Sequence, residues 1–80
     1  MFYFYLLQCK DGTLYAGSAK DVKQRELLHN TGRGSKYVKS RGGGKVVYKE
    51  KFRTWSRTLK REAEIKRWPR RRKLELIGNK

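Results

Sequence analysis

Two side chains that could do chemistry, Arg25 and His29, lie four residues apart in the stretch DVKQRELLHN, residues 21–30. Side chains at this spacing are neighbours on one face of a helix. That face also carries Val22 and Leu28, so the sequence predicts a guanidinium on the packed side of the helix. A guanidinium in such a place suits bidentate binding of a phosphate group. The structural alternative is that Arg25 lies along the surface and His29 stacks at the helix end.

A carboxylate, Glu62, falls on the apolar stripe of a second predicted helix in TWSRTLKREAEIKRW. The stripe consists of Trp55, Leu59, Ala63 and Ile65. Glu64, by contrast, points to the opposite side. Burying an unpaired carboxylate is costly, so we expect Glu62 to have an arginine partner or to bind a metal ion. A structural ion pair at the rim of the core is the competing interpretation.

Tyrosines are the third kind of candidate. Tyr3 and Tyr5 share one face of a predicted strand over residues 2–8, and Tyr15 lies in a returning strand that ends at Gly17. Gly17 allows another group to approach the backbone closely. Each tyrosine by itself is typical of core packing. The set is more informative, because phenols, a guanidinium, an imidazole and a carboxylate all lie on faces that can converge.

Composition excludes several other kinds of site. One cysteine and one histidine cannot form a zinc site, and the GRG and GGG segments lack the lysine and serine spacing of a P-loop. The lone Cys9 cannot form an internal disulfide, which favours a reducing, intracellular and cytoplasmic setting, with Cys9 as a small buried hydrophobe. The apolar run over residues 1–7 is too short for a membrane span, and no basic region precedes it as in a signal peptide.

The charge is the dominant property of the whole chain. Its 22 lysines and arginines against 7 acidic residues give a formal net charge of +15. Such a field attracts polyanions, nucleic acid above all, through phosphate contacts and counterion release. No segment combines a long apolar face with a basic one, so a membrane is not an expected partner. The residues expected to contact a nucleic-acid backbone are Lys20, Arg33, Lys36, Lys39, Arg41, Lys45, Arg70, Arg71 and Arg72.

These side chains have to be held by a small α+β unit, which we expect to be a single domain over residues 1–80. Predicted strands cover residues 2–8, 13–17 and 45–52, and predicted helices cover residues 22–29, 54–68 and 69–78. The first two strands are joined by a two-residue turn at Asp11-Gly12. The resulting order is β-β-α-β-α-α.

Local signals place the ends of the helices. Asp21 is the predicted N-cap of the first helix, and Thr54 or Ser56 is the predicted N-cap of the second. Trp68 and Pro69 end the second helix, because the residue before a proline resists helix. Pro69 can then open the last helix.

The third strand is expected to place Val46, Tyr48 and Glu50 on one face and Val47 on the other. The basic, glycine-rich stretch 31–44 before it is loop-like, with room for one helical turn over residues 35–39. A loop of this length is more often functional than a mere connector.

Taken together, these motifs resemble the GIY-YIG nuclease domain, and most closely its small stand-alone form. The matching text is YFYLLQCKDGTLYAG, KDVKQRELLHNTGRGSKYV and LKREAEIK. The match runs from Tyr3 to about Ile77. No single piece is specific, but the ordered set at these spacings is.

The resemblance implies a three-stranded antiparallel sheet flanked by helices. It also implies hydrolysis of DNA phosphodiester bonds with one divalent metal ion, Mg²⁺ or Mn²⁺. By position, it implies active-site roles for Tyr5, Tyr15, Arg25, His29 and Glu62, with Glu62 as the metal ligand. Tyr15, supported by Tyr5, would then position the attacking water or take its proton.

The sequence departs from the family pattern at a few positions. Tyr3 stands where the family name has glycine, and Gln24 replaces the first arginine of a pair that ends at Arg25. Glu26 stands where an apolar residue is common. We therefore expect the first helix to be slightly rotated, which would affect the place of His29.

The function expected from all of this is a metal-dependent DNA endonuclease in DNA repair or processing. With 80 residues, few side chains remain to read base edges, so cleavage should be structure-selective or only weakly sequence-selective, on branched or single-stranded DNA. One alternative is a catalytically inactive nucleic-acid-binding module with the same fold. Another is a basic RNA-associated protein unrelated to nucleases. All five active-site positions are filled, which favours the enzyme; the sequence leaves the oligomeric state open.

Overall fold

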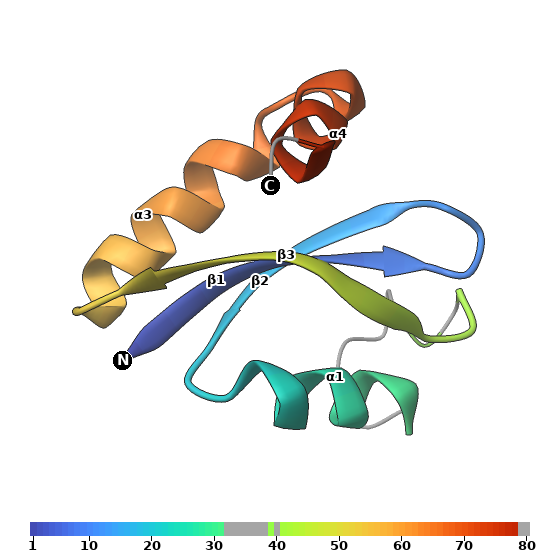
Figure 1. The fold of residues 1–80 in the computed structure, drawn as a ribbon, viewed down its shortest axis with the longest axis horizontal. Helices are drawn as coiled ribbons and strands as arrows, with labels where there is room; N and C mark the ends of the chain where they lie inside the picture. The colour runs from blue at the N-terminus through green and yellow to red at the C-terminus, as the bar shows by residue number, and fades with distance from the viewer. Residues whose placement is uncertain (32–38, 40, 79–80) are drawn as a thin grey trace.

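Three strands and three helices make up the part of the chain that the computed structural model describes, residues 1–31, 39 and 41–78 (Figure 1). The elements are β1 (Phe2–Cys9), β2 (Leu14–Ala19), α1 (Val22–Asn30), β3 (Gly44–Phe52), α3 (Trp55–Lys66) and α4 (Arg70–Gly78). The strands are antiparallel in the order β2-β1-β3. The expected α+β fold and its β-β-α-β-α-α order are therefore confirmed. The helical turn expected over residues 35–39 lies almost wholly outside the described residues.

Both faces of the sheet are covered, α1 lying against one and α3 with α4 against the other (Figure 1). The central strand β1 therefore buries side chains on both sides, which is why its sequence alternates only weakly. Tyr5, Leu7 and Cys9 pack with Val22 on the α1 side. On the α3 side the core consists of Phe4, Leu6, Ala16 and Ile65. Cys9 is buried, as expected of a small hydrophobe.

The predicted helix caps form as hydrogen bonds. Asp21 accepts one from the backbone N–H of Gln24 at 3.0 Å. Thr54, rather than Ser56, caps α3 by accepting from the N–H of Arg57 at 3.2 Å. α4 begins directly after Pro69. No helix in the described stretches has both the length and the apolar character needed to cross a membrane.

The β1–β2 hairpin has a three-residue loop instead of the expected two-residue turn. Cys9 donates its backbone N–H to the carbonyl of Thr13 at 2.8 Å, and Gly12 donates to the carbonyl of Cys9 at 2.9 Å. Gly12 has a φ of 89°, the left-handed conformation that such a loop requires at its last residue. The prediction of a hairpin at Asp11-Gly12 was correct, but its loop length was wrong by one residue.

A β-bulge changes the faces of β3. The register passes from Leu6 opposite Tyr48 to Leu7 opposite Val46, so Val47 is the extra residue. Val47 and Tyr48 consequently both pack on the α3 side, whereas Val46 packs on the α1 side. The prediction that Val46 shares a face with Tyr48 was wrong, because strict alternation fails wherever a strand carries one unpaired residue.

The side of α3 that meets the sheet also differs from the predicted stripe. Thr58 and Ile65 are fully buried, whereas Trp55 and Leu59 remain exposed. Thr58 can be buried because its hydroxyl donates to the carbonyl of Thr54 at 2.9 Å. The face of α3 that packs on the sheet is thus rotated away from the apolar stripe predicted from the sequence.

An ion-pair network fixes α3 against β3. Arg61 donates to both carboxylate oxygens of Glu50, at 2.8 and 3.0 Å, and the hydroxyl of Tyr48 donates to the same carboxylate at 2.5 Å. Such bidentate pairs fix orientation as well as adding energy. We expected Glu62 to have an arginine partner or to bind a metal ion, but Arg61 pairs with Glu50 instead.

Candidate active site

The five residues implied by the sequence gather around the edge strand β2. They are Tyr5 on β1, Tyr15 on β2, Arg25 and His29 on α1, and Glu62 on α3; we call them the active-site cluster. The two tyrosines lie on the α1 side of the sheet, because Tyr15 is paired opposite Leu7. Glu62 comes from the other side and meets β2 through Ser18. The cluster is thus built from both faces of the sheet at one edge.

Tyr5 and His29 form its buried centre. The phenol oxygen of Tyr5 lies 3.0 Å from Nε2 of His29, and the two side chains are only 1% and 2% exposed. Tyr15 completes an aromatic group, with its ring centroid 5.3 Å from that of His29 and 6.5 Å from that of Tyr5. Two phenols and one imidazole are thus packed together at this edge of the sheet.

Gly17 makes room for the Tyr5 ring. It lies directly opposite Tyr5 in the β1–β2 pairing. A Cβ atom at this position would lie 2.5 Å from the phenol oxygen of Tyr5, which no real side chain tolerates without displacement. The close approach predicted beside Gly17 is therefore confirmed, and the approaching group is a member of the cluster itself.

Glu26, which stands where the family commonly has an apolar residue, has a specific partner. Its carboxylate accepts the backbone N–H of Val46 at 2.5 Å, which ties α1 to β3. His29, on the same helix, is buried. The slight rotation of α1 expected from the sequence stays a prediction.

Burial keeps the Tyr5–His29 pair neutral. Burial, then the neighbouring Tyr15, raises the pKa of Tyr5 far above its ordinary value of 10, and the Arg25 guanidinium only partly opposes this. Burial, then the charge of Arg25, lowers the pKa of His29 below 6.5. At neutral pH the pair can pass or hold a proton, but the buried phenol does not ionise readily.

Glu62 is held by two partners that the sequence analysis did not identify. Its Oε1 accepts a hydrogen bond of 2.5 Å from the hydroxyl of Ser18, and its Oε2 lies 2.9 Å from Nζ of Lys66. The hydrogen bond with Glu62 raises the pKa of Lys66, and nearby Tyr15 adds to the rise. Lys66 could have been found from its i, i+4 spacing; Ser18, 44 residues away, had no such signal.

The donor set at Glu62 fits a divalent cation that keeps most of its waters. Among the residues that the structure describes, no three His, Cys, Asp or Glu side chains come together as a cage. Mg²⁺ commonly binds through only one or two carboxylates plus a substrate phosphate. The Glu62 side chain is 19% exposed, so its oxygens can be reached from solvent. A cation there would have to share Oε2 with Lys66 or displace it.

Arg25 lies where a substrate phosphate could reach it. It is half-buried on α1 and lines a hollow of about 320 Å³ together with Phe2, Lys20 and Trp55. Its guanidinium is near enough to Tyr5 and His29 to affect the pKa of both. The predicted placement of Arg25 on the packed face of the helix is thus confirmed.

Asn30, which follows His29, has a structural role. Its side chain accepts the N–H of Gly44 and donates to the carbonyl of the same residue, both at 2.9 Å. It also donates to the carbonyl of Glu26 at 3.0 Å. These bonds tie the end of α1 to the start of β3 and so help to hold His29 in place.

The basic residues expected to bind nucleic acid fall into three groups. Arg41 pairs with Asp11 at 2.7 Å, Arg70 donates to the carbonyl of Gly12 at 2.7 Å, and the guanidinium of Arg72 stacks 4.1 Å from the ring of Trp68. The exposed residues Lys20, Lys39, Lys45 and Arg71 form the second group. Arg33 and Lys36 lie outside the described residues.

Comparison with known proteins identifies the family and agrees with the fold. The family model of the GIY-YIG catalytic domain matches residues 1–75. The chain therefore belongs to the GIY-YIG family, whose domains are nucleases.

Several bacterial proteins resemble the chain over nearly its whole length. A UPF0213 protein of Staphylococcus saprophyticus is 52% identical over 76 residues, which is 95% of this chain and 93% of that protein. A UPF0213 protein of Staphylococcus epidermidis is 48% identical over 75 residues, 94% and 92% of the two chains. The solution NMR structure of the UPF0213 protein BH0048 from Bacillus halodurans has a TM-score of 0.63 and 37% identity, and the match covers 100% of this chain and 86% of that one.

Proposed function

We propose that this protein is a divalent-metal-dependent endonuclease that hydrolyses phosphodiester bonds in DNA. The observation that carries the proposal is the convergence of a buried Tyr5–His29 pair with Tyr15, Arg25 and Glu62 at one edge of the sheet. Membership of a nuclease family supports the class of reaction. A net charge of +15 supports a polyanionic substrate.

Each side chain of the cluster would have its own role in the reaction. Arg25 would bind the scissile phosphate and neutralise the charge that develops on it. Tyr15, half-buried at the edge, would orient the attacking water or accept its proton, while the neutral Tyr5–His29 pair holds the tyrosine in place. Mg²⁺ or Mn²⁺, held by Glu62, would supply Lewis-acid polarisation of the phosphate and stabilise the leaving oxygen.

The substrate is proposed to be selected by structure more than by sequence. Reading a sequence requires side chains in a groove against base edges. The described elements are all engaged in building the sheet and its two covering layers, and the cluster sits at an edge strand. Branched or single-stranded DNA, met during DNA repair or processing in the cytoplasm, is the substrate class that we propose.

One observation favours a second candidate, a nucleic-acid-binding module without activity. Glu62 already has a positive partner in Lys66 at 2.9 Å and a hydroxyl partner in Ser18. A carboxylate satisfied in this way can serve as a structural link between α3 and β2. In that case the chain would bind DNA and cut none of it.

Cleavage of labelled plasmid, single-stranded and branched DNA, with Mg²⁺, with Mn²⁺ or with chelator, tests the proposal. We expect metal-dependent cutting that Glu62→Gln abolishes and that Arg25→Ala lowers by about 10²–10³-fold. The matched controls are Glu64→Gln and Arg57→Ala, exposed residues of α3 outside the active-site cluster. They should cut normally. Salt-sensitive binding without cutting by the unmodified protein would establish the second candidate instead.

A further inference from the structure

The surface beside Arg25 has an aromatic wall. Trp55, the first residue of α3, is 41% exposed, and its ring lies 5.5 Å from that of Phe2 at an angle of 59°. Nζ of Lys20 lies 5.6 Å from the centroid of the Phe2 ring. These three residues and Arg25 line the hollow of about 320 Å³. An exposed tryptophan at the rim of a hollow next to an active-site arginine suggests a contact with the substrate.

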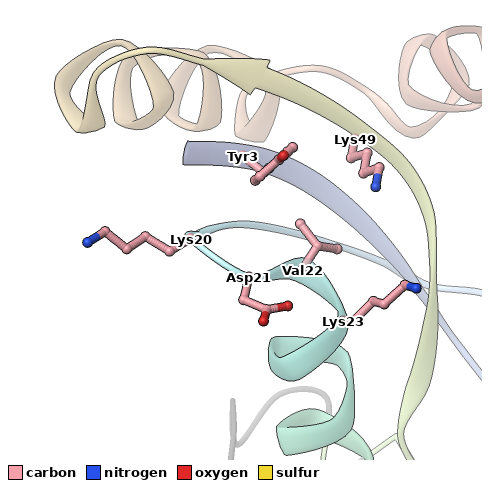
Figure 2. A pocket seen from close by; sticks show the side chains of 6 residues that line it. All are labelled: Tyr3, Lys20, Asp21, Val22, Lys23 and Lys49. Atoms are coloured by element: carbon pink, nitrogen blue, oxygen red, sulfur yellow. The ribbon is translucent and has the colours of Figure 1, made fainter. Parts of the chain in front are cut away.

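Two more hollows continue from this one. Lys20 also lines a hollow of about 310 Å³ with Tyr3, Lys23 and Lys49. Figure 2 shows Lys23 extending from α1 and Lys49 from β3 on either side of it, while Lys20 extends the other way. Lys23 and Lys49 in turn line a third hollow, of about 290 Å³, with Lys45 between α1 and β3. Lys20 lines the first two hollows, and Lys23 and Lys49 line the last two, so the three hollows follow one another along a path from Arg25 to β3.

We call this path the basic track and define it by Lys20, Lys23, Lys45 and Lys49. Within the described part of the chain, none of the four forms an ion pair. The two carboxylates along the path, Asp21 and Glu26, are each held by a backbone N–H. The lysines therefore keep their positive charge available for a polyanion that lies in the track.

We infer that the basic track, together with Trp55, binds single-stranded nucleic acid. An unpaired base next to the scissile phosphate stacks on Trp55, and the phosphates beyond it follow the lysines into the groove between α1 and β3. Aromatic side chains beside a positively charged groove are how proteins hold single strands. A paired base has both faces covered in the duplex, so only an unpaired base can lie on the tryptophan. The inference rests on the proposed function for its nucleic-acid substrate and adds which form is bound, and where.

The stacking contact is tested by binding of a labelled oligothymidylate of about 10 nucleotides in metal-free buffer, a length within the range of single-strand sites. We expect Trp55→Leu to weaken binding roughly 5- to 100-fold. Leu59→Ala is the matched control, because Leu59 lies one turn further along α3 and is 42% exposed. In the unmodified protein, bound oligonucleotide should quench tryptophan fluorescence, and Trp55→Leu should lose most of that quenching.

The lysines are tested by the salt dependence of the same binding. Lys23→Gln/Lys49→Gln should reduce the slope of log affinity against log salt by about 1.4, the value for two phosphate contacts on a single strand. Arg57→Gln/Lys60→Gln removes the same charge from a hollow on the α3 side of the sheet and should leave the slope nearly unchanged.

The outcomes separate this inference from the nuclease proposal. If Trp55→Leu and the lysine pair both lose binding and the unmodified protein cuts no DNA, the track stands and the nuclease proposal fails. If the protein cuts DNA but both variants bind the single strand with the affinity and salt dependence of their controls, the track is refuted and the nuclease proposal stands. Binding of a duplex of the same length more tightly than the single strand would also refute the track.

Discussion

Glu62 is the one member of the active-site cluster that reaches the edge strand from the α3 side of the sheet. Its two oxygens are held by different elements, Ser18 on β2 and Lys66 one turn further along α3. The carboxylate is therefore oriented before any substrate or metal arrives. The ammonium of Lys66 has two opposite effects: it helps to orient the carboxylate, and it would compete with a metal cation for Oε2.

Removing Lys66 should make a metal ion easier to bind. A partly exposed ion pair of this kind contributes about 0.2–1 kcal/mol, so Lys66→Gln should lower the Mn²⁺ concentration for half-maximal cleavage by about 1.4- to 5-fold. A metal titration of the cleavage rate measures this. Lys60→Gln, on an exposed part of the same helix, is the control. A higher metal requirement in Lys66→Gln would mean that the lysine assists the site instead of competing.

Loss of the hydroxyl should have different effects at the two tyrosines, mainly on stability at Tyr5 and mainly on catalysis at Tyr15. Tyr5→Phe removes the hydrogen bond to buried His29 and should lower the free energy of unfolding by about 1–2 kcal/mol. Tyr15→Phe should change stability less but lower kcat by about 10²-fold or more, as expected for loss of a general base. Urea unfolding and initial rates measure the two effects. The reverse ranking in kcat would assign the base to Tyr5.

His29 should make stability depend on pH. Its pKa in the folded protein lies below 6.5 because of burial and the charge of Arg25. Below about pH 6.5 the unfolded chain therefore takes up the proton first, so the free energy of unfolding falls as the pH drops from 7 toward 5. For a single titrating group the slope cannot exceed about 1.4 kcal/mol per pH unit. His29→Gln should remove this part of the slope, and an unchanged slope in that variant would contradict the assignment.

Strand β2 is the element on which the site depends, because it presents different residues to its two sides. Tyr15 and Gly17 belong to the α1 side, whereas Ser18 faces α3. Alternation along a single short strand therefore lets one edge hold side chains from both layers. A small protein can thus combine residues from two covering helices without a second domain.

Gly17→Ala should displace Tyr5. The added methyl group would lie 2.5 Å from the phenol oxygen, so the ring has to move or the sheet has to yield. We expect a loss of about 1–3 kcal/mol of stability, typical of overpacking, together with reduced cleavage. Thermal or urea unfolding measures the first effect. Gly78→Ala, where nothing lies within 4 Å of the added atom, is the control and should be close to neutral.

At the scale of the whole molecule, charge acts in two opposite ways. With 22 basic and 7 acidic side chains, the folded protein repels itself. The same excess attracts nucleic acid and releases its counterions. The few acidic residues have specific partners. Glu50 pairs with Arg61 between β3 and α3, and Glu62 pairs with Lys66 within α3. Asp21 and Glu26 accept hydrogen bonds from backbone N–H groups.

Salt should therefore stabilise the free protein while it weakens binding. Raising NaCl from about 0.02 to 0.3 M shortens the Debye length to below about 8 Å, so the repulsion between exposed charges farther apart than that is largely screened. If this restores about 1 kcal/mol, Tm should rise by roughly 4–8 °C for a chain of this size. Thermal unfolding and oligonucleotide binding in one buffer series measure both effects. A Tm that falls with added NaCl would contradict the expected self-repulsion.

The sequence by itself determined the class of fold and the family, and it named the residues of the proposed active site. Helix caps such as Asp21, the spacing of Arg25 and His29, and the turn at Gly12 are local signals, which short-range sterics and hydrogen bonding translate directly into structure. The charge of the chain is a matter of composition alone. For these features no knowledge of distant contacts was needed.

The tertiary structure decided what depends on contacts between elements. The bulge at Val47 follows from how β3 pairs with β1. The contact of Glu62 with Ser18 and the exposure of Trp55 follow from how α3 docks on the sheet. The helix α3 packs in the orientation that lets its buried Thr58 form a hydrogen bond and its Arg61 pair with Glu50. Part of its apolar stripe then stays in solvent. The distance between Ser18 and Glu62 in the sequence shows why no local pattern could have revealed their contact.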